Sequence, residues 1–189
     1  TEFSEGRYGA VVVGAGHAGS EAALALARTG IKTAMLTLNL DSIAFMACNP
    51  SVGGTAKGQI VREIDALGGE MGINADKSLL QIRMLNRGKG AAVRSLRGQA
   101  DKNLYHRNMK KTLESTENLR ILQGEAVEIL VENGKVKGVK TAFGGVLYCD
   151  AVVLATGVYL NGSVIAGEWQ RSSGPNGFQP ANELTANLI

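Results

Sequence analysis

The fold of this chain is decided by Ala10-Val11-Val12-Val13-Gly14-Ala15-Gly16-His17-Ala18-Gly19, an apolar run followed by glycines spaced GxGxxG. The run predicts a buried strand, and the alanine- and leucine-rich segment Glu21–Arg28 predicts a helix after the turn. The first glycine permits a tight turn, the second leaves room for a pyrophosphate, and the third lets the helix approach the strand. Helix amides then face negative charge, so we predict a phosphate-binding turn at Gly14, Ala15, Gly16, His17, Ala18 and Gly19. A glycine turn that binds no ligand is the alternative.

Length and composition describe an ordinary globular chain. It has 189 residues, of which 44% are hydrophobic and 20% are charged, so we expect one domain with at most a small insertion. No apolar stretch is long enough for a membrane span, and no signal-peptide pattern opens the chain. Cys48 and Cys149 lie far apart and lack metal-ligand spacing, which predicts reduced thiols, no metal site and a cytoplasmic location.

The net charge of +3 is unevenly distributed. From Arg83 to Lys111, nine basic residues accompany one acid, Asp101, which gives this window a charge of +8. This asymmetry indicates a polyanionic partner or a cofactor phosphate, and a solvated helix face is the alternative. We assign Lys89, Arg94 and Arg97, which lie in a glycine loop and the helix start after it, to a cofactor pocket. The predicted nucleic-acid contacts lie on the following helix, at Lys102, Arg107, Lys110 and Lys111.

The order of the predicted elements indicates one open parallel sheet of an α/β protein. We expect Thr1–Tyr8 to be frayed and Leu38–Ala56 to be a long loop. The predicted helices are His17–Thr29, Lys57–Leu67 and Arg97–Leu113, with a last helix at Leu184–Ile189. The predicted strands are Ala10–Val13, Lys32–Thr37, Leu79–Leu85, Leu119–Leu122, Val127–Val131, Val136–Thr141, Val146–Tyr148 and Ala151–Leu154. The expected strand order is 3-2-1 with a final strand beside the first, and a three-stranded β-meander covers one face.

Two loops supply further candidate site residues. The tip of the second strand carries no acid where a ribose is usually bound, so Asn39 or Asp41 is the candidate for that contact. The loop Ala47–Gly58 places Cys48 before a double glycine and a helix start that bears Lys57. Amides, a helix dipole and a lysine favour a thiolate, so Cys48 is the candidate nucleophile, with an inert structural cysteine as the alternative.

These segments together resemble the MnmG family, also called GidA, the FAD-containing subunit of a tRNA wobble-uridine modification enzyme. The resemblance runs from about Ala10 to Gly162 and is most specific in the Cys-Asn-Pro loop. The sister family TrmFO shares the first glycine turn, but its acidic second-strand tip is not seen here. The matching segments are Gly14–Gly19, Cys48–Gly54 with Lys57-Gly58, Glu63–Gly69, Arg83–Asn86 with Lys89-Gly90, Gln99–Asp101, and Val153–Gly157 with Leu160–Gly162.

The resemblance implies a Rossmann-like FAD-binding domain of the two-dinucleotide-binding flavoprotein type. That domain would occupy residues 1–162, and 163–189 would be the truncated start of a following segment. Family members take a hydride from NADH, use methylenetetrahydrofolate as carbon donor, form homodimers, and act with an MnmE-type GTPase on C5 of uridine 34 in tRNA. Cys48 matches a cysteine considered for attack on uracil C6. The implied FAD contacts are Gly14–Gly19, Asn49, Gly53, Gly54, Thr156, Gly157 and, through its backbone, Val127.

Three functions remain open from the sequence. The first is the N-terminal part of an FAD-dependent enzyme that forms 5-carboxymethylaminomethyl uridine. The second is an FAD- or NAD-binding module, or an oxidoreductase relative, that does not modify tRNA. The third is an RNA-binding fragment in which the basic helix matters more than the glycine turn. Because the family is several times longer, we expect this chain alone to bind FAD weakly and to be inactive.

Overall fold

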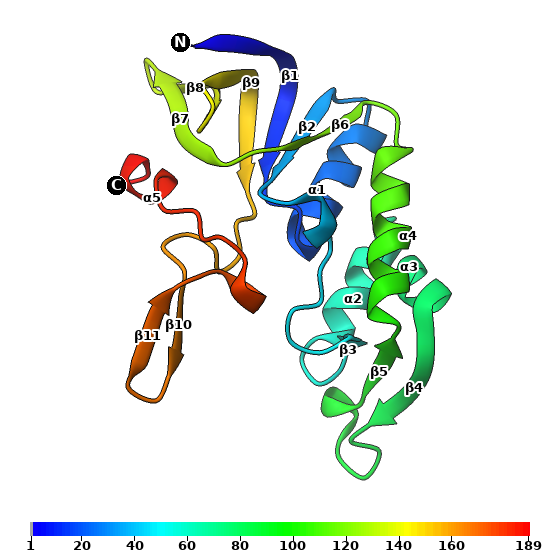
Figure 1. Ribbon diagram of the computed structural model, residues 1–189. Coiled ribbons are helices and arrows are strands. Elements are labelled where there is room, and N and C mark those ends of the chain that lie inside the picture. The colour runs from blue at the N-terminus through cyan, green and yellow to red at the C-terminus, as the bar shows by residue number, and fades with distance from the viewer. Residues whose placement is uncertain (1) are drawn as a thin grey trace. The chain divides into compact units, whose positions relative to one another are not determined.

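The structure, a computed structural model, describes residues 2–189 and is built around a six-stranded sheet (Figure 1). The strand order is β6-β2-β1-β9-β8-β7. Four neighbouring strands are parallel, namely β6 (Leu119–Gln123), β2 (Thr33–Thr37), β1 (Phe3–Val13) and β9 (Gly145–Leu154). This arrangement confirms the predicted order 3-2-1 with a final strand beside the first.

The chain divides into two compact units. The first contains the residues up to Ile43 together with Leu113–Ile189, and the second contains Ala44–Thr112. Besides the six-stranded sheet, the first unit holds α1 (His17–Arg28), the hairpin β10 (Ser163–Ala166) and β11 (Trp169–Ser172), and α5 (Leu184–Asn187). Short 3-10 turns occur at Leu40–Ser42, Ala91–Val93 and Pro175–Gly177. Across residues 2–189 no helix is both long enough and apolar enough to cross a membrane.

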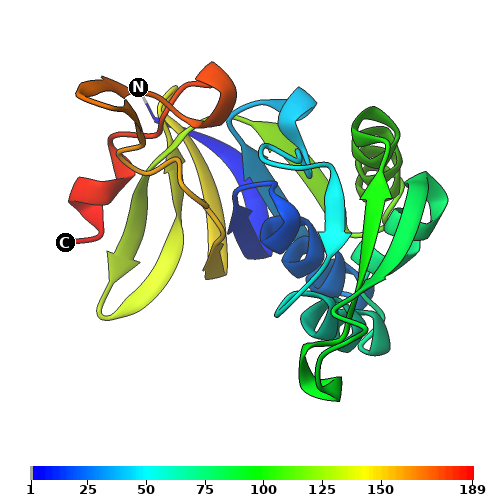
Figure 2. The ribbon, with the colours of Figure 1, turned by 90° about the horizontal axis from the view of Figure 1, so that it is seen from below.

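The second unit contains an antiparallel three-stranded sheet and short helices (Figure 2). The strand order is β3-β5-β4, with β5 in the centre. Its elements are β3 (Ser51–Gly53), α2 (Gly58–Ala66), α3 (Met71–Ser78), β4 (Leu79–Leu85), β5 (Ser95–Ala100) and most of α4 (Lys102–Glu114). The predicted end of α2 at the glycine pair is confirmed, because Gly68 has a φ of +86° that favours glycine.

Burial of apolar side chains explains the parallel core. All five residues of β2 are buried, and Val11 and Val12 of β1 are fully buried. Helix α1 packs on these strands through apolar side chains, with Ala23, Leu24 and Ala27 on its buried face. Burial of such side chains is the main favourable contribution to folding, about 25 cal/mol per Å² of apolar surface.

The prediction of a frayed N-terminus is wrong. Strand β1 begins at Phe3, and its first residues pair with the first residues of β9, from Phe3 opposite Gly145 onward. Tyr8 is buried in the core, and the Lys140 ammonium lies 2.6 Å from the Glu2 carboxylate. The polar residues of this segment suggested disorder. Its backbone N–H and C=O groups, however, pair with a strand about 140 residues further along the chain.

The β-meander is confirmed, but its predicted place over a face of the sheet is wrong. Strands β7 (Ala126–Glu132) and β8 (Lys135–Thr141) form a hairpin, and β8 pairs with the first half of β9. The meander therefore extends the sheet at its edge. The two short strands predicted over residues 146–154 form the single strand β9, because β1 pairs along its whole length.

The predicted helix from Arg97 to Leu113 begins five residues too early. Residues 95–100 form β5, and α4 starts at Lys102, where Asp101 Oδ1 accepts a hydrogen bond of 2.9 Å from the Leu104 amide. Strands β3, β10 and β11 and helix α3 were also missed. Apart from Leu96, the residues of β5 are small or polar, so the strand depends on partners at both edges rather than on an apolar pattern.

Adjacent residues of β9 test this account of the core. Leu147 is 0% exposed and Tyr148 is 40% exposed. We expect Leu147→Ala to lower the free energy of unfolding by about 2–5 kcal/mol, because it leaves a cavity. Tyr148→Thr, which keeps strand propensity, should change it by about 0.5 kcal/mol. Urea unfolding measures both values, and equal losses for the two variants would contradict the burial pattern.

Candidate functional site

The glycine turn is shaped by contacts between backbone atoms. Gly14 has a φ of +107°, and a Cβ at this residue would collide with the carbonyl oxygen of Ala155. A Cβ at Gly19 would collide with the carbonyl oxygen of Gly14. Neither obstacle is a flexible side chain, so both positions require glycine for the fold itself. The roles predicted for the first and third glycines are therefore the roles that the structure gives them.

Gly16 differs from its two neighbours in the motif. A Cβ at Gly16 would meet nothing within 4 Å, and its backbone is extended, with φ −71° and ψ −168°. It is the N-cap residue of α1, and no side chain caps the helix. The positive end of the helix dipole thus faces open space that a side chain neither fills nor neutralises. Open space before uncapped amides is what a phosphate requires.

The segment after β9 adjoins this turn. The Ala155 amide donates a hydrogen bond of 2.8 Å to the carbonyl oxygen of Val13, which continues the pairing of β9 with β1. Thr156 and Gly157 follow, and Gly157 has a φ of +58°. The backbone nitrogen of Thr156 lies among the atoms nearest to a Cβ built at Gly14. The structure therefore brings Thr156 and Gly157 to the carboxyl ends of β1 and β9, beside the predicted phosphate turn.

Asn39 lies at the carboxyl end of β2 and caps a 3-10 turn. Its Oδ1 accepts a hydrogen bond of 2.7 Å from the Asp41 amide. The side-chain oxygen is therefore engaged within the loop, and the amide NH₂ of Asn39 is the group suited to a ribose hydroxyl. The backbone of Asp41 is held in the same turn, so the two candidates for the ribose contact form one local structure.

Val127 reaches the same end of the sheet through the turn that precedes β7. The Gly124 amide donates a hydrogen bond of 2.8 Å to the carbonyl oxygen of Thr37, at the end of β2. Val127 itself is half-buried and lines a surface cavity of about 530 Å³. The other residues of this cavity are Glu128, Lys140, Thr141, Ala142, Gly144, Glu183, Ala186 and Asn187.

His17 is the first residue of α1 and lies within the glycine motif. Burial lowers the pKa of its imidazole, so the neutral ring is favoured near pH 7. The turn therefore relies on backbone amides and the helix dipole for its positive potential, and a histidine charge adds nothing to it at neutral pH.

The Cys48 loop belongs to the second unit, and its glycines have a structural purpose. Cys48 and Asn49 are exposed. Gly53 has a φ of +82°, and a Cβ there would collide with the carbonyl oxygen of Leu96 on β5. Gly54 has a φ of +99°, and its carbonyl oxygen accepts hydrogen bonds from two amides at the start of α2 and from the Ser95 hydroxyl. Strand β3, which the sequence did not predict, lies between Cys48 and α2 along the chain.

The four predicted nucleic-acid contacts on α4 divide into two groups. Lys102 is half-buried, and its Nζ lies 3.9 Å from the centroid of the Phe45 ring. At about 100° per residue, Arg107 and Lys111 lie exposed on the face opposite the buried stripe of this helix, whereas Lys110 is half-buried at the edge of that stripe. The buried stripe is Tyr105, Met109 and Leu113.

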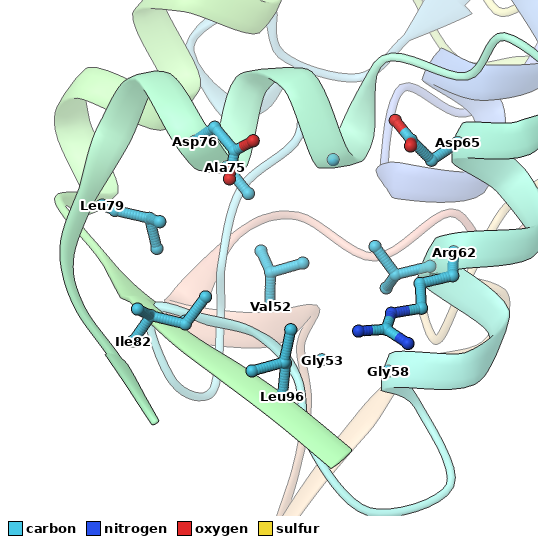
Figure 3. Close-up of a pocket in the computed structure, with 13 residues that line it drawn as sticks. Val52, Gly53, Gly58, Arg62, Asp65, Ala75, Asp76, Leu79, Ile82 and Leu96 are labelled. Atoms are coloured by element: carbon cyan, nitrogen blue, oxygen red, sulfur yellow. The ribbon is translucent and has the colours of Figure 1, made fainter. Parts of the chain in front are cut away.

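The second unit also contains a cavity that the sequence did not indicate (Figure 3). Its volume is about 170 Å³, and apolar side chains of β3, β4 and β5 line it. Arg62 and Asp65 reach it from α2, and Asp76 from α3. The spacing of Arg62 and Asp65 is helical, but α3 was not predicted, so its carboxylate was missed. Within residues 2–189 no group of three or more histidine, cysteine or acidic side chains is placed to hold a metal ion.

Known proteins with a similar sequence identify the family of this chain. A family model described as glucose inhibited division protein A matches residues 9–189. The tRNA uridine 5-carboxymethylaminomethyl modification enzyme MnmG of Alkaliphilus metalliredigens is 58% identical over 187 residues, and that of Geobacillus thermodenitrificans is 60% identical. Each alignment covers 99% of this chain and 30% of the relative. The chain thus spans about 30% of the length of these curated relatives.

Solved structures of GidA and of a GidA-related protein resemble the fold of this chain. The crystal structure of GidA from Aquifex aeolicus has a TM-score of 0.91 at 50% identity, over 95% of this chain and 30% of that one. A GidA-related protein from Thermus thermophilus has a TM-score of 0.69 at 23% identity, over 96% of this chain and 67% of that one, and it shares the fold. The predicted α/β fold with a parallel sheet is therefore confirmed.

The lowered pKa of His17 predicts a dependence of stability on pH. Because the folded state favours the neutral ring, the unfolded chain binds the proton first as the pH falls through about 6.5. Stability is then complete above that pH and decreases below it, by at most about 1.4 kcal/mol per pH unit from this group. His17→Asn should remove this part of the slope in urea unfolding at a series of pH values. A slope that persists in this variant, and disappears in His106→Asn instead, would contradict the assignment.

Proposed function

The chain belongs to the glucose inhibited division protein A family, and we propose that it is the FAD-binding portion of an enzyme that modifies tRNA uridines. Relatives named tRNA uridine 5-carboxymethylaminomethyl modification enzyme align with 99% of the chain, which supports this reaction for the whole protein. The corresponding product is 5-carboxymethylaminomethyl uridine at wobble position 34. We propose residues 1–162 as the N-terminal part of the FAD-binding domain and 163–189 as the start of the following segment.

The open space at Gly16 carries the cofactor proposal. Gly14 and Gly19 are glycines because backbone atoms occupy the positions of their side chains. No neighbouring atom explains Gly16, which leaves a ligand in front of α1 as the reason for a missing side chain. The negative charge of a diphosphate complements the positive end of the α1 dipole at this position. The absence of an arginine at the tip of β2 gives no support for a cofactor with a 2′-phosphate, in keeping with FAD.

The remaining cofactor contacts follow from position in the sheet. Residues Gly14 to Gly19 would hold the pyrophosphate, and Thr156 and Gly157 would border it at the end of β9. Asn39 would donate to a ribose hydroxyl, and Val127 would contact FAD through its backbone. Asn49, Gly53 and Gly54 remain proposed contacts, although Gly53 and Gly54 already have structural reasons to be glycine. FAD, when bound, supplies hydride transfer, with NADH as the proposed source of the hydride.

Cys48 is the proposed nucleophile of the whole enzyme. Its exposed thiol, after loss of its proton, would add as a thiolate to C6 of uracil, and the electron pair of the C5–C6 bond would move toward the C4 carbonyl. C5 then becomes a nucleophile toward a one-carbon unit, with methylenetetrahydrofolate as the proposed donor. Loss of the C5 proton and expulsion of the thiolate restore the ring. Within the residues that the structure describes, the other cysteine is Cys149, where burial raises the pKa to about 11, which makes it unsuited to this role.

The proposed partners complete the assignment. We propose tRNA as substrate, contacted by Arg107 and Lys111 on the exposed face of α4 and by Lys110 at its edge, with Lys102 close to Phe45 and so a weaker candidate. An MnmE-type GTPase, a homodimer and a cytoplasmic location are proposed for the whole protein from the family resemblance. An FAD- or NAD-binding module without tRNA modification is the remaining alternative, and turnover of NADH distinguishes it.

Two glycine substitutions in one motif test the FAD proposal. Gly16→Ala should lower FAD affinity at least about tenfold, because its Cβ enters the phosphate space. The same change should alter the free energy of unfolding by less than about 1 kcal/mol, since no atom lies within 4 Å. Gly19→Ala should lower that free energy by about 1–3 kcal/mol, because the new Cβ displaces the Gly14 carbonyl.

Quenching of FAD fluorescence measures affinity, and urea unfolding without FAD measures stability. The unchanged chain must bind FAD for the proposal to stand. If Gly16→Ala bound FAD as tightly as the unchanged chain, the space before α1 would not be the phosphate site.

The role of Cys48 needs the full-length protein. We expect Cys48→Ser to bind FAD with unchanged affinity and to lose at least about 10³-fold in the rate of tRNA modification, because serine is a much poorer nucleophile at neutral pH. Cys149→Ser is the matched control and should keep the rate where it folds. Modification by Cys48→Ser at the unchanged rate would remove Cys48 from the mechanism.

A further inference from the structure

The hairpin of β4 and β5 is the most strongly charged element of the second unit. Residues 79–100 contain no aspartate or glutamate, and they carry five basic side chains. All five are exposed, and within residues 2–189 none of them makes an ion pair. We call this set the basic hairpin, and its members are Arg83, Arg87, Lys89, Arg94 and Arg97.

Two of these cations oppose each other directly across the strands. Arg83 of β4 pairs in register with Arg97 of β5, so both side chains project from the same face of the sheet. Like charges at directly opposite positions destabilise a strand pair. The strands offer no carboxylate to relieve this repulsion. An anion bound between the two guanidinium groups would relieve it.

The loop that joins the strands is held in one conformation by side-chain hydrogen bonds. Asn86 has a φ of +57°, and its Nδ2 donates to Thr55 Oγ1 at 2.8 Å and to the Val93 carbonyl at 2.9 Å. The Nε of Arg94 donates to the Lys89 carbonyl at 3.3 Å. Arg87 and Lys89 therefore project from a backbone whose position is already set. Less conformational entropy is lost when such a loop binds a ligand.

We propose that the basic hairpin binds the phosphate backbone of an RNA, independently of base sequence. This inference rests on the proposed function, in which that RNA is tRNA, and it gives the RNA a second contact besides the face of α4. The proposal replaces the cofactor pocket predicted from the sequence for Lys89, Arg94 and Arg97, because a cofactor diphosphate needs cations that converge on one point. Here the cations extend from the paired Arg83 and Arg97 along the strands to the loop, which suits an extended polyanion.

Two double substitutions in the whole chain test the proposal. Arg83→Gln with Arg97→Gln removes the opposed pair, and Arg87→Gln with Lys89→Gln removes the loop cations. Each should weaken binding of unmodified tRNA several-fold and reduce the slope of log K against log salt concentration by about 1–2. The control is Lys135→Gln with Lys137→Gln, which removes the same charge from β8 and should leave the slope unchanged.

Two further measurements separate a loss of RNA contacts from a loss of folding or of cofactor binding. The melting temperature of the Arg83→Gln, Arg97→Gln variant should be equal to or higher than that of the unchanged chain, because the repulsion is gone. The FAD affinity of both hairpin variants, from fluorescence quenching, should also be unchanged.

The inference is overturned if the unchanged chain does not bind tRNA, or if it binds with a salt slope that the hairpin variants share. It is also overturned if these variants lose FAD affinity while they keep the slope, because the cations would then serve the cofactor. If the hairpin variants share the salt slope of the unchanged chain, or if they lose only FAD affinity, the proposed function still stands. Failure of the unchanged chain to bind FAD, with altered slopes in the hairpin variants, would instead refute the flavin assignment and leave the RNA surface supported.

Discussion

The close contact between the backbones of Gly14, Gly19 and Ala155 is the constraint on which the rest of the first unit depends. It joins the end of β1, the start of α1 and the end of β9 with no side chain between them. Because the helix is held so close to the strands, its first turn faces the carboxyl edge of the sheet. Open α/β sheets bind ligands at that edge. The open space at Gly16, where we propose a phosphate, is thus a consequence of how tightly its neighbours pack.

Glycine serves a different purpose in the second unit. Gly53 and Gly54 hold the Cys48 loop against β5, and the Gly54 carbonyl accepts hydrogen bonds from the start of α2. In the sequence these glycines resemble a second ligand loop. The structure shows that a neighbouring backbone already excludes a side chain at Gly53. A glycine indicates a ligand only where the space beside it is open, as at Gly16, and this distinction needs coordinates.

The sequence predicted those parts of the fold whose signals are local. The apolar run before Gly14 and the alanines of α1 sufficed for the first βαβ unit, and the glycines located the candidate phosphate turn. Elements stabilised by distant partners were missed. The first residues of β1 are polar and depend on β9, and β5 lacks an apolar pattern because it depends on β3 and β4. The cavity beside Arg62 was missed for the same reason, since α3 was not predicted.

Folding distributes the basic residues between Arg83 and Lys111 over two different elements. Along the chain they form one block, but the structure separates them into a hairpin and a helix. Lys102 becomes a weaker candidate because its ammonium group lies over the Phe45 ring. Arg83 and Arg97 become neighbours through strand pairing, although they are separated in the sequence. A solvated surface gains nothing from a like-charge pair that weakens its own sheet. Electrostatic cost without a folding benefit is therefore the strongest indication that the hairpin, more than the helix, is shaped by an anionic partner.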